Sequence, residues 1–561
     1  MKGRMKKVLA LLLCSAIGLS VSACGATSND PVNESVSDAG QSVDSGAEST
    51  AATEVSGDVV PGWQKHADEK VTLSWYINYS WFPATWGGNL VSDTVTELTG
   101  VDIEFVVPAG NESEKLNSMI ASDTLPDILT IGAGTSQIED MIEADMIYAL
   151  NELADEYDAY FWTVVNEERA GWYTKEDGNF YGYPNISTSP SDIEANEGAF
   201  ISTQTFLVRK DMYEAIGSPD MTTPEGFIKA IKDAAEMFPE VNGRPIIPFG
   251  THEFSSTGNY AFESYLQNFL AIPYEQDGVA YDRLTDPEYV EWLKVFRSLG
   301  AEGYLSDDIF IDTRTQMDEK IAQGRYFCML YQRSDITDPQ KALYANDPDS
   351  IYLAIDGPKN SAGDDPTLSG PSITGWTLTM ISKNCEHPDR AIELLSYLMS
   401  EEGQLMMYMG VEGVTYDMVD GEAVMKEEII DLANNDNAAY TTEYGGMNTY
   451  WMMADTVMQI PWVPATVAPM DQVEDWTRPY VSSMAQYNYI LPSDSDEANI
   501  LLKVNNEWSS TLPKLLLAST EEEFDELFNK FLDKREAYGY DKVLEEYTRQ
   551  LKENKRKLGI E

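Results

Sequence analysis

Hydrophobic and polar positions near the start of the main body follow two alternating patterns. Short apolar runs rich in β-branched and aromatic residues occupy 71–77, 101–107 and 126–131, and each run predicts a strand. Between them, 89–99 and 113–122 carry apolar residues at helical spacing. The order strand, helix, strand, helix, strand predicts a parallel sheet with right-handed crossovers. Ligands of such sheets bind beyond the carboxyl ends of the strands.

Helical patterning dominates the rest of the chain. A strand that runs directly into a helix is predicted over 206–217, and Pro224 marks the start of another helix. The stretch 388–399 has one apolar face and predicts a further helix. Near the carboxyl end, Ser519 and Glu522 fit a capping box ahead of a helix. We therefore predict an α/β fold with long helices throughout.

The amino terminus carries an export signal. Four Lys and Arg residues within the first seven positions precede the apolar run 8–21, which is too short for a membrane span of ~20 residues. Small residues then lead to Cys24, and the sequence Val-Ser-Ala-Cys at 21–24 resembles the bacterial lipobox. This motif implies a lipoprotein signal peptide at 1–23 and lipid attachment to Cys24. The alternative is an ordinary cleaved signal peptide with a chance cysteine.

The segment behind this signal has the composition of a tether. From 24 to about 66 the chain consists mainly of Ser, Ala, Gly, Asp, Glu and Val, with no aromatic residue before Trp63. Such a segment cannot bury apolar surface, so a flexible tether is predicted over 24–66. A lipid and a spacer would hold the folded body near the outer face of the cell membrane. No later stretch is apolar enough to predict another membrane span.

Composition restricts the class of protein further. The 561 residues include 38 basic and 94 acidic side chains, for a net charge of −56, which repels phosphate backbones and disfavours nucleic-acid binding. The 12 Trp, 31 Tyr and 18 Phe predict a sizeable core. Four cysteines are too few for a disulfide framework. Cys328 and Cys385 lie in strand-like apolar runs, which favours two buried thiols over a disulfide.

The sequence contains none of the common catalytic motifs. There is no P-loop and no nucleophile elbow, and Gly132 with Gly134 lacks the third glycine of a dinucleotide fingerprint. Three histidines leave little material for a His-based metal site, and no acidic cluster matches the twelve-residue calcium loop. We therefore predict no cofactor and no metal ligands, and we leave a structural calcium ion open. Two carboxylates facing each other across a cleft, as glycoside hydrolysis needs, stay an alternative.

Aromatic residues gather in segments that are predicted to be loops. Trp81 and Trp86 follow the first strand, Tyr331 follows the predicted strand 326–330, and Trp376 follows a glycine. Flat aromatic faces stack on the C–H faces of sugar rings, while polar side chains nearby bind the hydroxyl groups. The pattern therefore predicts a neutral oligosaccharide site. The alternative for each of these residues is a place in the core.

Short motifs spread over nearly the whole mature chain resemble those of one known family. They include Leu-Pro-Asp-Ile-Leu at 125–129, Tyr-Gly-Tyr-Pro at 181–184 and further motifs at 206–211, 222–225, 322–324, 374–376, 381–388, 400–404 and 413–416. Their order and spacing resemble the bacterial extracellular solute-binding lipoproteins of ABC importers, in the large Gram-positive branch of the carbohydrate-type family 1.

This resemblance implies a periplasmic-binding-protein-like α/β fold, with two lobes, a hinge and an interlobe ligand cleft. Lobe 1 would comprise 67–186 and 376–412, and lobe 2 would comprise 187–375 and 413–561. The ligand-binding residues implied by the resemblance are Tyr79, Trp81, Trp86, His252, Glu253, Tyr331, Arg333, Trp376 and Trp451.

The resemblance also implies a function. We expect a non-enzymatic, monomeric, lipid-anchored protein of the extracellular face of the cell membrane. It would bind an oligosaccharide and deliver it to the transmembrane permease subunits of an ABC importer. The alternatives are the same fold with a non-sugar solute such as a peptide, and a surface glycoside hydrolase.

Overall fold

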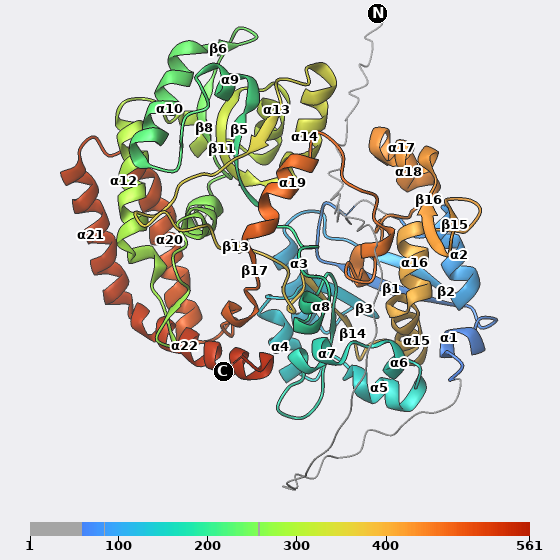
Figure 1. The fold of residues 1–561 in the computed structure, drawn as a ribbon. Coiled ribbons are helices and arrows are strands. Elements are labelled where there is room, and N and C mark those ends of the chain that lie inside the picture. Colours follow the sequence, from blue (N-terminus) through green and yellow to red (C-terminus); the bar gives the residue numbers. More distant parts are fainter. Residues whose placement is uncertain (1–58, 83–84, 256–257, 561) are drawn as a thin grey trace, which may run out of the picture.

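The computed structural model describes residues 59–82, 85–255 and 258–560. Within these residues the chain forms two α/β lobes that lie side by side (Figure 1). The blue, cyan and light-orange parts of the ribbon build lobe 1, and the green, yellow and red parts build lobe 2. The signal peptide predicted at 1–23, the lipid site predicted at Cys24 and most of the predicted tether lie outside the described residues.

A five-stranded sheet with the order β2–β1–β3–β14–β4 forms the centre of lobe 1. Strands β2, β1 and β3 are parallel, as predicted, and β14 runs antiparallel to β3 and to β4. The strands are β1 (Val71–Ile77), β2 (Val101–Val106), β3 (Ile128–Gly132), β4 (Tyr183–Pro184) and β14 (Thr377–Ile381). The late strand β14 therefore returns the chain to the first sheet after the chain has formed the sheet of lobe 2.

Local sequence explains how the first crossover helix is placed. Helix α2 (Leu90–Thr99) begins after Asn89, whose side chain accepts a hydrogen bond from the Ser92 backbone N–H. It ends at Gly100, whose φ of 76° is a left-handed conformation that favours glycine. Helix α3 (Glu112–Ser122) makes the second crossover. Both helices thus connect parallel strands, which is the arrangement that the strand–helix alternation predicts.

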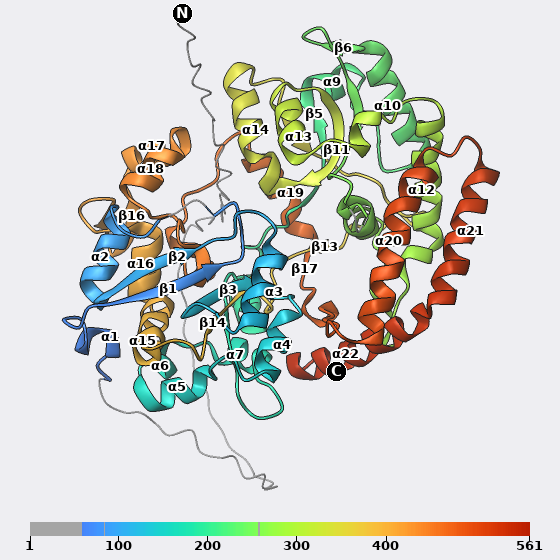
Figure 2. The same cartoon turned by 180° about the vertical axis from the view of Figure 1, so that it is seen from behind.

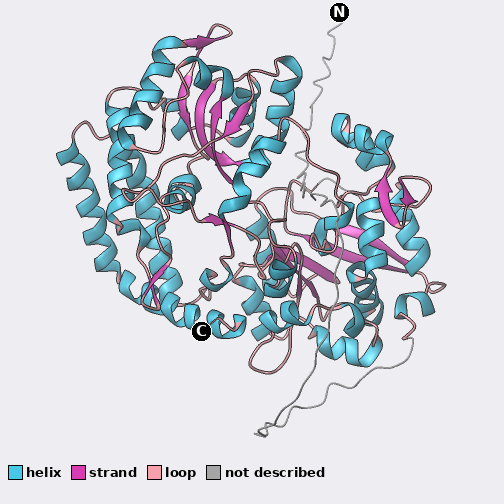
Figure 3. Ribbon diagram, viewed as in Figure 1, coloured by secondary structure: helices cyan, strands magenta, loops and turns pink. Residues whose placement is uncertain are grey.

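Lobe 2 is built on a four-stranded sheet with the order β12–β5–β11–β8. Strand β11 is parallel to β8, whereas β5 runs antiparallel to β11 and to β12. The strands are β5 (Gln204–Arg209), β8 (Ile247–Gly250), β11 (Tyr326–Gln332) and β12 (Tyr352–Ala354). Figure 3 shows each of the two sheets surrounded by helices. Cys328 in β11 and Cys385 in lobe 1 are both buried free thiols, as interpreted from the sequence.

Long helices cover the outer side of lobe 2. They are α10 (Pro224–Met237), α12 (Pro287–Ala301), α20 (Asp496–Leu516), α21 (Glu521–Tyr538) and α22 (Tyr540–Leu558). In Figure 2 the red helices α20, α21 and α22 form the outer edge of this lobe. Helix α21 is capped by the Thr520 side chain, which accepts a hydrogen bond from the Glu523 N–H, so the predicted cap at Ser519 is one residue early. No helix in the described ranges is long and apolar enough to cross a membrane.

Within the described ranges, three chain segments connect the two lobes. Residues 185–203 lead from β4 to β5, 355–376 lead from β12 back to β14, and 455–470 lead from lobe 1 to α19 (Asp471–Thr477). Helix α19 packs against β5 and β12 of lobe 2. A short parallel pairing of β13 (Leu368–Ser369) with β17 (Val481–Ser482) ties the second connection to the segment that follows α19.

The structure moves two of the predicted boundaries. Helix α1 (Gly62–Lys65) packs on α15 (Pro388–Met399), and Trp63 is only 3% exposed, so the folded body begins before the predicted tether end at residue 66. Residues 413–463 were predicted in lobe 2. They instead continue the core of lobe 1, because Tyr450–Met453 lie in the same cluster as β1. Chain order could not reveal either contact, because each joins segments more than 300 positions apart.

Candidate ligand-binding site

The carboxyl ends of the parallel strands meet at one edge of each sheet. In lobe 1, β1 and β3 end at Ile77 and Gly132, and the antiparallel strand β14 begins at the same edge. The Ala133 N–H donates a hydrogen bond of 3.0 Å to the Trp376 carbonyl, which fixes Trp376 beside the end of β3. The loop after β1 reaches the same place, so side chains from three segments converge there.

Four of the predicted residues form one aromatic cluster at this edge, here called the aromatic platform: Tyr79, Trp81, Trp376 and Trp451. The Trp376 ring lies 4.4 Å from Trp451 and 5.1 Å from Tyr79, between ring centroids. The rings of Trp81 and Trp376 are 6.1 Å apart with planes only 6° from parallel. Trp451 is 7% exposed and Trp81 is 44% exposed, so the platform has a buried base and an open face.

Trp86 does not join the platform. Its ring packs on Tyr450 at 4.7 Å and on Phe105 at 6.2 Å, and its indole N–H donates to the Thr96 hydroxyl at 2.8 Å. The position of Trp86 after the first strand made it resemble Trp81 in sequence. The structure corrects the prediction, because all of these partners belong to the packing between α2, β2 and the 450–453 segment.

The corresponding edge of lobe 2 carries a second group of aromatic side chains. Strands β8 and β11 are parallel and end near one another, which brings His252 to within 4.7 Å of Tyr331 between ring centroids. Tyr265 lies 5.3 Å and Tyr260 6.0 Å from the His252 ring, and Tyr260 is 57% exposed. Among the described residues, the His252 Nε2 atom and the Tyr331 hydroxyl have no hydrogen-bond partner.

Charge around this group is set by one arginine and several carboxylates. Burial, together with the nearby Arg314 guanidinium, lowers the pKa of His252 to about 4, so its imidazole is neutral at pH 7. Arg314 forms ion pairs with Asp318 and Asp335. Burial raises the pKa of Glu253, and Arg314 acts in the opposite direction. The His252 side chain therefore offers one hydrogen-bond donor and one acceptor without a charge.

Arg333 does not face this edge. It is 2% exposed, and its Nη1 atom forms an ion pair with Glu474 at 2.8 Å. Its Nε atom also donates to the Ser202 carbonyl. Glu474 belongs to α19, so the ion pair fastens the third connection to lobe 2. The structure thus assigns Arg333 a structural contact where the sequence predicted a ligand contact.

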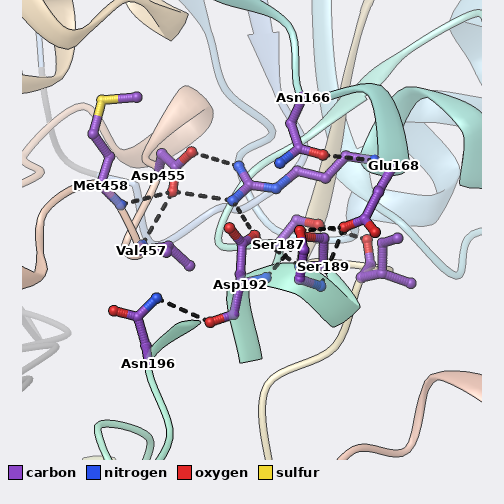
Figure 4. Close-up of polar contacts among 12 residues, drawn as sticks. Asn166, Glu168, Ser187, Ser189, Asp192, Asn196, Asp455, Val457 and Met458 are labelled. Carbon is purple, nitrogen blue, oxygen red and sulfur yellow. Dashed lines mark hydrogen bonds and ion pairs between the residues drawn. The ribbon is translucent and has the colours of Figure 1, made fainter. Parts of the chain in front are cut away.

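A second arginine that the sequence did not single out joins three segments near the connections. Arg169, on α7 (Glu167–Tyr173), donates to Asp192 on α8 (Pro190–Ala195) and to Asp455, with one N–O distance of 2.8 Å to Asp192 (Figure 4). The Ser189 side chain caps α8 by accepting a hydrogen bond from the Asp192 N–H, and the Ser189 N–H in turn donates to the Asp192 carboxylate. One guanidinium thus holds lobe 1, the first connection and the start of the third.

Two α/β lobes, three connections and aromatic side chains at both sheet edges define a two-lobed solute-binding protein. The chain belongs to the family of bacterial extracellular solute-binding proteins, whose family model matches residues 91–430. No metal-binding group of three or more His, Cys, Asp or Glu side chains occurs within the described ranges.

Named relatives agree with this family. The polygalacturonan/rhamnogalacturonan-binding protein YtcQ of Bacillus subtilis is 21% identical over 508 residues, covering 87% of this chain and 93% of the relative. The lipoprotein LipO of the same organism is 22% identical over 364 residues, covering 62% of this chain and 67% of the relative.

Solved structures show the same fold. The substrate-binding protein FusA of S. pneumoniae, in complex with kestose, superposes with a TM-score of 0.65 at 16% identity, covering 87% of this chain and all of that chain. The alginate-binding protein AlgQ2 gives a TM-score of 0.62 at 17% identity, covering 87% of this chain and 99% of that chain. At these identities the likeness concerns the fold.

Proposed function

We propose that this chain is the extracellular, lipid-anchored substrate-binding component of an ABC importer and that it binds an oligosaccharide between its two lobes. The observation that carries the proposal is the aromatic platform. Family membership supports a binding role, and the relatives support an oligosaccharide. YtcQ is named for polygalacturonan and rhamnogalacturonan, and FusA was solved with kestose.

The platform suits the flat face of a sugar ring. Trp81 presents an open indole, and the buried Trp451 and the partly buried Trp376 hold it in place through ring contacts of 5.8 and 6.1 Å. A rigid aromatic surface loses little conformational entropy when a ligand binds. Burial raises the pKa of Tyr79 to about 12, so its phenol stays neutral and can hydrogen-bond to a hydroxyl group.

The edge of lobe 2 adds complementary polar groups, which are buried in this structure. The unpartnered His252 Nε2 atom and Tyr331 hydroxyl match the donors and acceptors of sugar hydroxyl groups. Tyr260 adds a second exposed ring. A ligand that touches both edges stabilises only the arrangement in which the lobes approach each other, so binding shifts the population toward a closed form. The permease subunits would then recognise that form.

The proposal is tested by thermal denaturation with a panel of kestose, oligogalacturonides and short peptides. A ligand at 100 times its Kd stabilises the folded state by about 2.7 kcal/mol, which raises the melting temperature. We expect an oligosaccharide to do so and peptides to have no effect. A shift with peptides alone would favour the non-sugar alternative.

The chain offers a matched pair of variants for the same assay. Trp81 and Trp162 are 44% and 42% exposed, and both lie in lobe 1, but Trp162 is outside the platform. We expect Trp81→Ala to lose most of the ligand-induced shift and Trp162→Ala to keep it. Mass spectrometry of the recovered sugar distinguishes binding from hydrolysis, because a shortened glycan would contradict the binding role.

A further inference from the structure

Lobe 2 contains a second pocket, with a volume of about 250 Å³, that lies apart from the His252 group. Its walls come from the π-helix η1 (Ala261–Leu266), from residues 274–284 and from helices α20 and α22. We call it the lateral pocket, because it lies beside α20 and α22, in the group of red helices on the outer side of this lobe (Figure 2). Its volume is below the ~300–1,000 Å³ typical of sites for drug-sized ligands, so it suits a molecule of monosaccharide size.

Helix η1 separates the lateral pocket from the candidate oligosaccharide site. Glu263 and Gln267 line the pocket, whereas Tyr265 and its neighbour Tyr260 contact His252. A π-helix is rare and occurs frequently at functional sites. The two sites therefore share one helix, which presents different side chains to each of them.

The lateral pocket holds an arginine that forms no ion pair with any of the described carboxylates. The Arg283 guanidinium stacks on the Tyr274 ring at 3.7 Å and donates to the Asn268 side-chain oxygen at 2.7 Å. In the described part of the chain no carboxylate forms an ion pair with Arg283, although Asp286 acts on it from a greater distance, and its Nε atom has no partner. The second arginine of the pocket, Arg535, is instead paired with Asp282. Because arginine stays charged, an unpaired guanidinium in such a wall favours an anion.

The remaining walls fit the rest of a small polar molecule. Tyr489 stacks on Tyr547 with a centroid distance of 4.4 Å, and its hydroxyl has no partner among the described residues. Asn505 adds an amide with both a donor and an acceptor. Burial raises the pKa of Glu263 to about 7, so near neutral pH its carboxyl group is partly protonated and opposes an anion less than an ordinary glutamate.

We propose that the lateral pocket binds a sugar acid of monosaccharide size, with its carboxylate on Arg283 and its hydroxyl groups on Asn505 and Tyr489. Aromatic rings, an amide and a phenol recognise a hydroxylated carbon frame, and a guanidinium recognises the carboxylate. The site lies within one lobe, so its ligand binds without closing the hinge.

Isothermal titration calorimetry of the full mature chain with sodium D-glucuronate tests the proposal, with D-glucose as the neutral comparison. We expect glucuronate to bind at least about tenfold more tightly than glucose, as a charge-assisted hydrogen bond requires. Arg283→Gln should weaken glucuronate binding by about the same factor. Asn505→Trp fills the pocket while it keeps Arg283, and it should abolish binding; circular dichroism confirms that both variants fold.

The Trp81→Ala variant separates this proposal from the oligosaccharide proposal. It should lose the oligosaccharide and keep glucuronate, because Trp81 belongs to lobe 1. Glucuronate binding that disappears in Trp81→Ala would place the sugar acid between the lobes and overturn the lateral site. Equal affinity for glucose and glucuronate, unchanged affinity in folded Arg283→Gln, or no heat with either sugar would also overturn it. A failure of all oligosaccharides would leave the glucuronate result unaffected.

Discussion

The buried ion pair between Arg333 and Glu474 makes a prediction that separates a structural role from a ligand contact. Their side chains are 3% and 1% exposed, and the Nη1–Oε1 distance is 2.8 Å. Removing one partner of such a pair leaves a buried charge without compensation, which typically costs about 3–5 kcal/mol of unfolding free energy. Thr466 donates a further hydrogen bond to Glu474, so that carboxylate keeps one partner when Arg333 is replaced.

The two single variants are not equivalent. Glu474→Gln leaves a guanidinium that cannot lose its proton, so we expect the full loss of about 3–5 kcal/mol. In Arg333→Met the Glu474 carboxylate can take up a proton instead, and the loss at pH 7 should be smaller. Burial already raises the pKa of Glu474 above its ordinary value of 4.5, and the Arg333 guanidinium opposes that shift. Without Arg333 the pKa rises further.

The sign of the pH dependence follows from this difference. In Arg333→Met the folded state binds a proton at a higher pH than the unfolded chain does. Stability relative to wild type therefore increases as the pH falls toward 4.5, the ordinary pKa of a glutamate. Glu474→Gln has no titrating group at this position and should show no such recovery.

Urea denaturation followed by circular dichroism at several pH values measures these quantities. The double variant Arg333→Met with Glu474→Leu should be more stable than Glu474→Gln, because it removes both charges and leaves none unpaired. Two single variants within about 1 kcal/mol of wild type would refute the argument. If folded Arg333→Met protein no longer bound the oligosaccharide, Arg333 would again have to be regarded as a ligand contact.

Three further predictions concern the site and the connections. Trp376→Ala should weaken oligosaccharide binding by about 2 kcal/mol, or roughly 30-fold in Kd, as expected for a central aromatic contact. Titration of the Trp162→Ala control should give the same Kd as wild type. The free energy of unfolding of the wild type should fall as the pH decreases from 6.5 to 4, by up to about 3 kcal/mol from His252 alone. The reason is that His252 takes up a proton at a higher pH in the unfolded chain than in the folded protein. His252→Gln should lack this contribution in denaturation curves measured across that pH range. Arg169→Gln should lose about 3 kcal/mol of unfolding free energy, because it leaves the carboxylates of Asp192 and Asp455 without their ion-pair partner. Arg169→Lys should recover only part of this loss, since lysine cannot donate to both carboxylates in the same geometry.

The fold of lobe 1 could be predicted because its signals are local. The runs at 71–77 and 101–107 correspond to β1 and β2 within one residue, and Pro388 begins α15 as expected. Strand periodicity, helix caps and turn residues act over a few positions, so they survive in a single sequence. The return of 413–463 to lobe 1 has no local signal, because it depends on Tyr450 and its neighbours packing against strands more than 300 residues earlier.

The residues of the candidate site also fall into those that the sequence could predict and those that it could not. Tyr79, Trp81 and Trp376 follow or precede strand ends, and the parallel sheet brings such positions to one edge, so their convergence could be predicted. Trp86 and Arg333 also lie in segments that follow a strand. Trp86 nevertheless packs against Tyr450, and Arg333 forms an ion pair with Glu474 of α19. Sequence pattern locates the end of a strand, but the direction of the next side chain depends on partners that are distant in the chain.

The tyrosines of lobe 2 show why periodicity alone was not enough there. Tyr260 and Tyr265 are five positions apart, and at about 100° per residue an α-helix would place them on different faces. In the structure their rings are 5.2 Å apart and both contact His252. The π-helix η1 explains this, because hydrogen bonds between residues i and i+5 bring positions five apart onto one face. The same local widening directs Glu263 to the lateral pocket, so one irregular turn determines which side chains reach each of the two proposed sites.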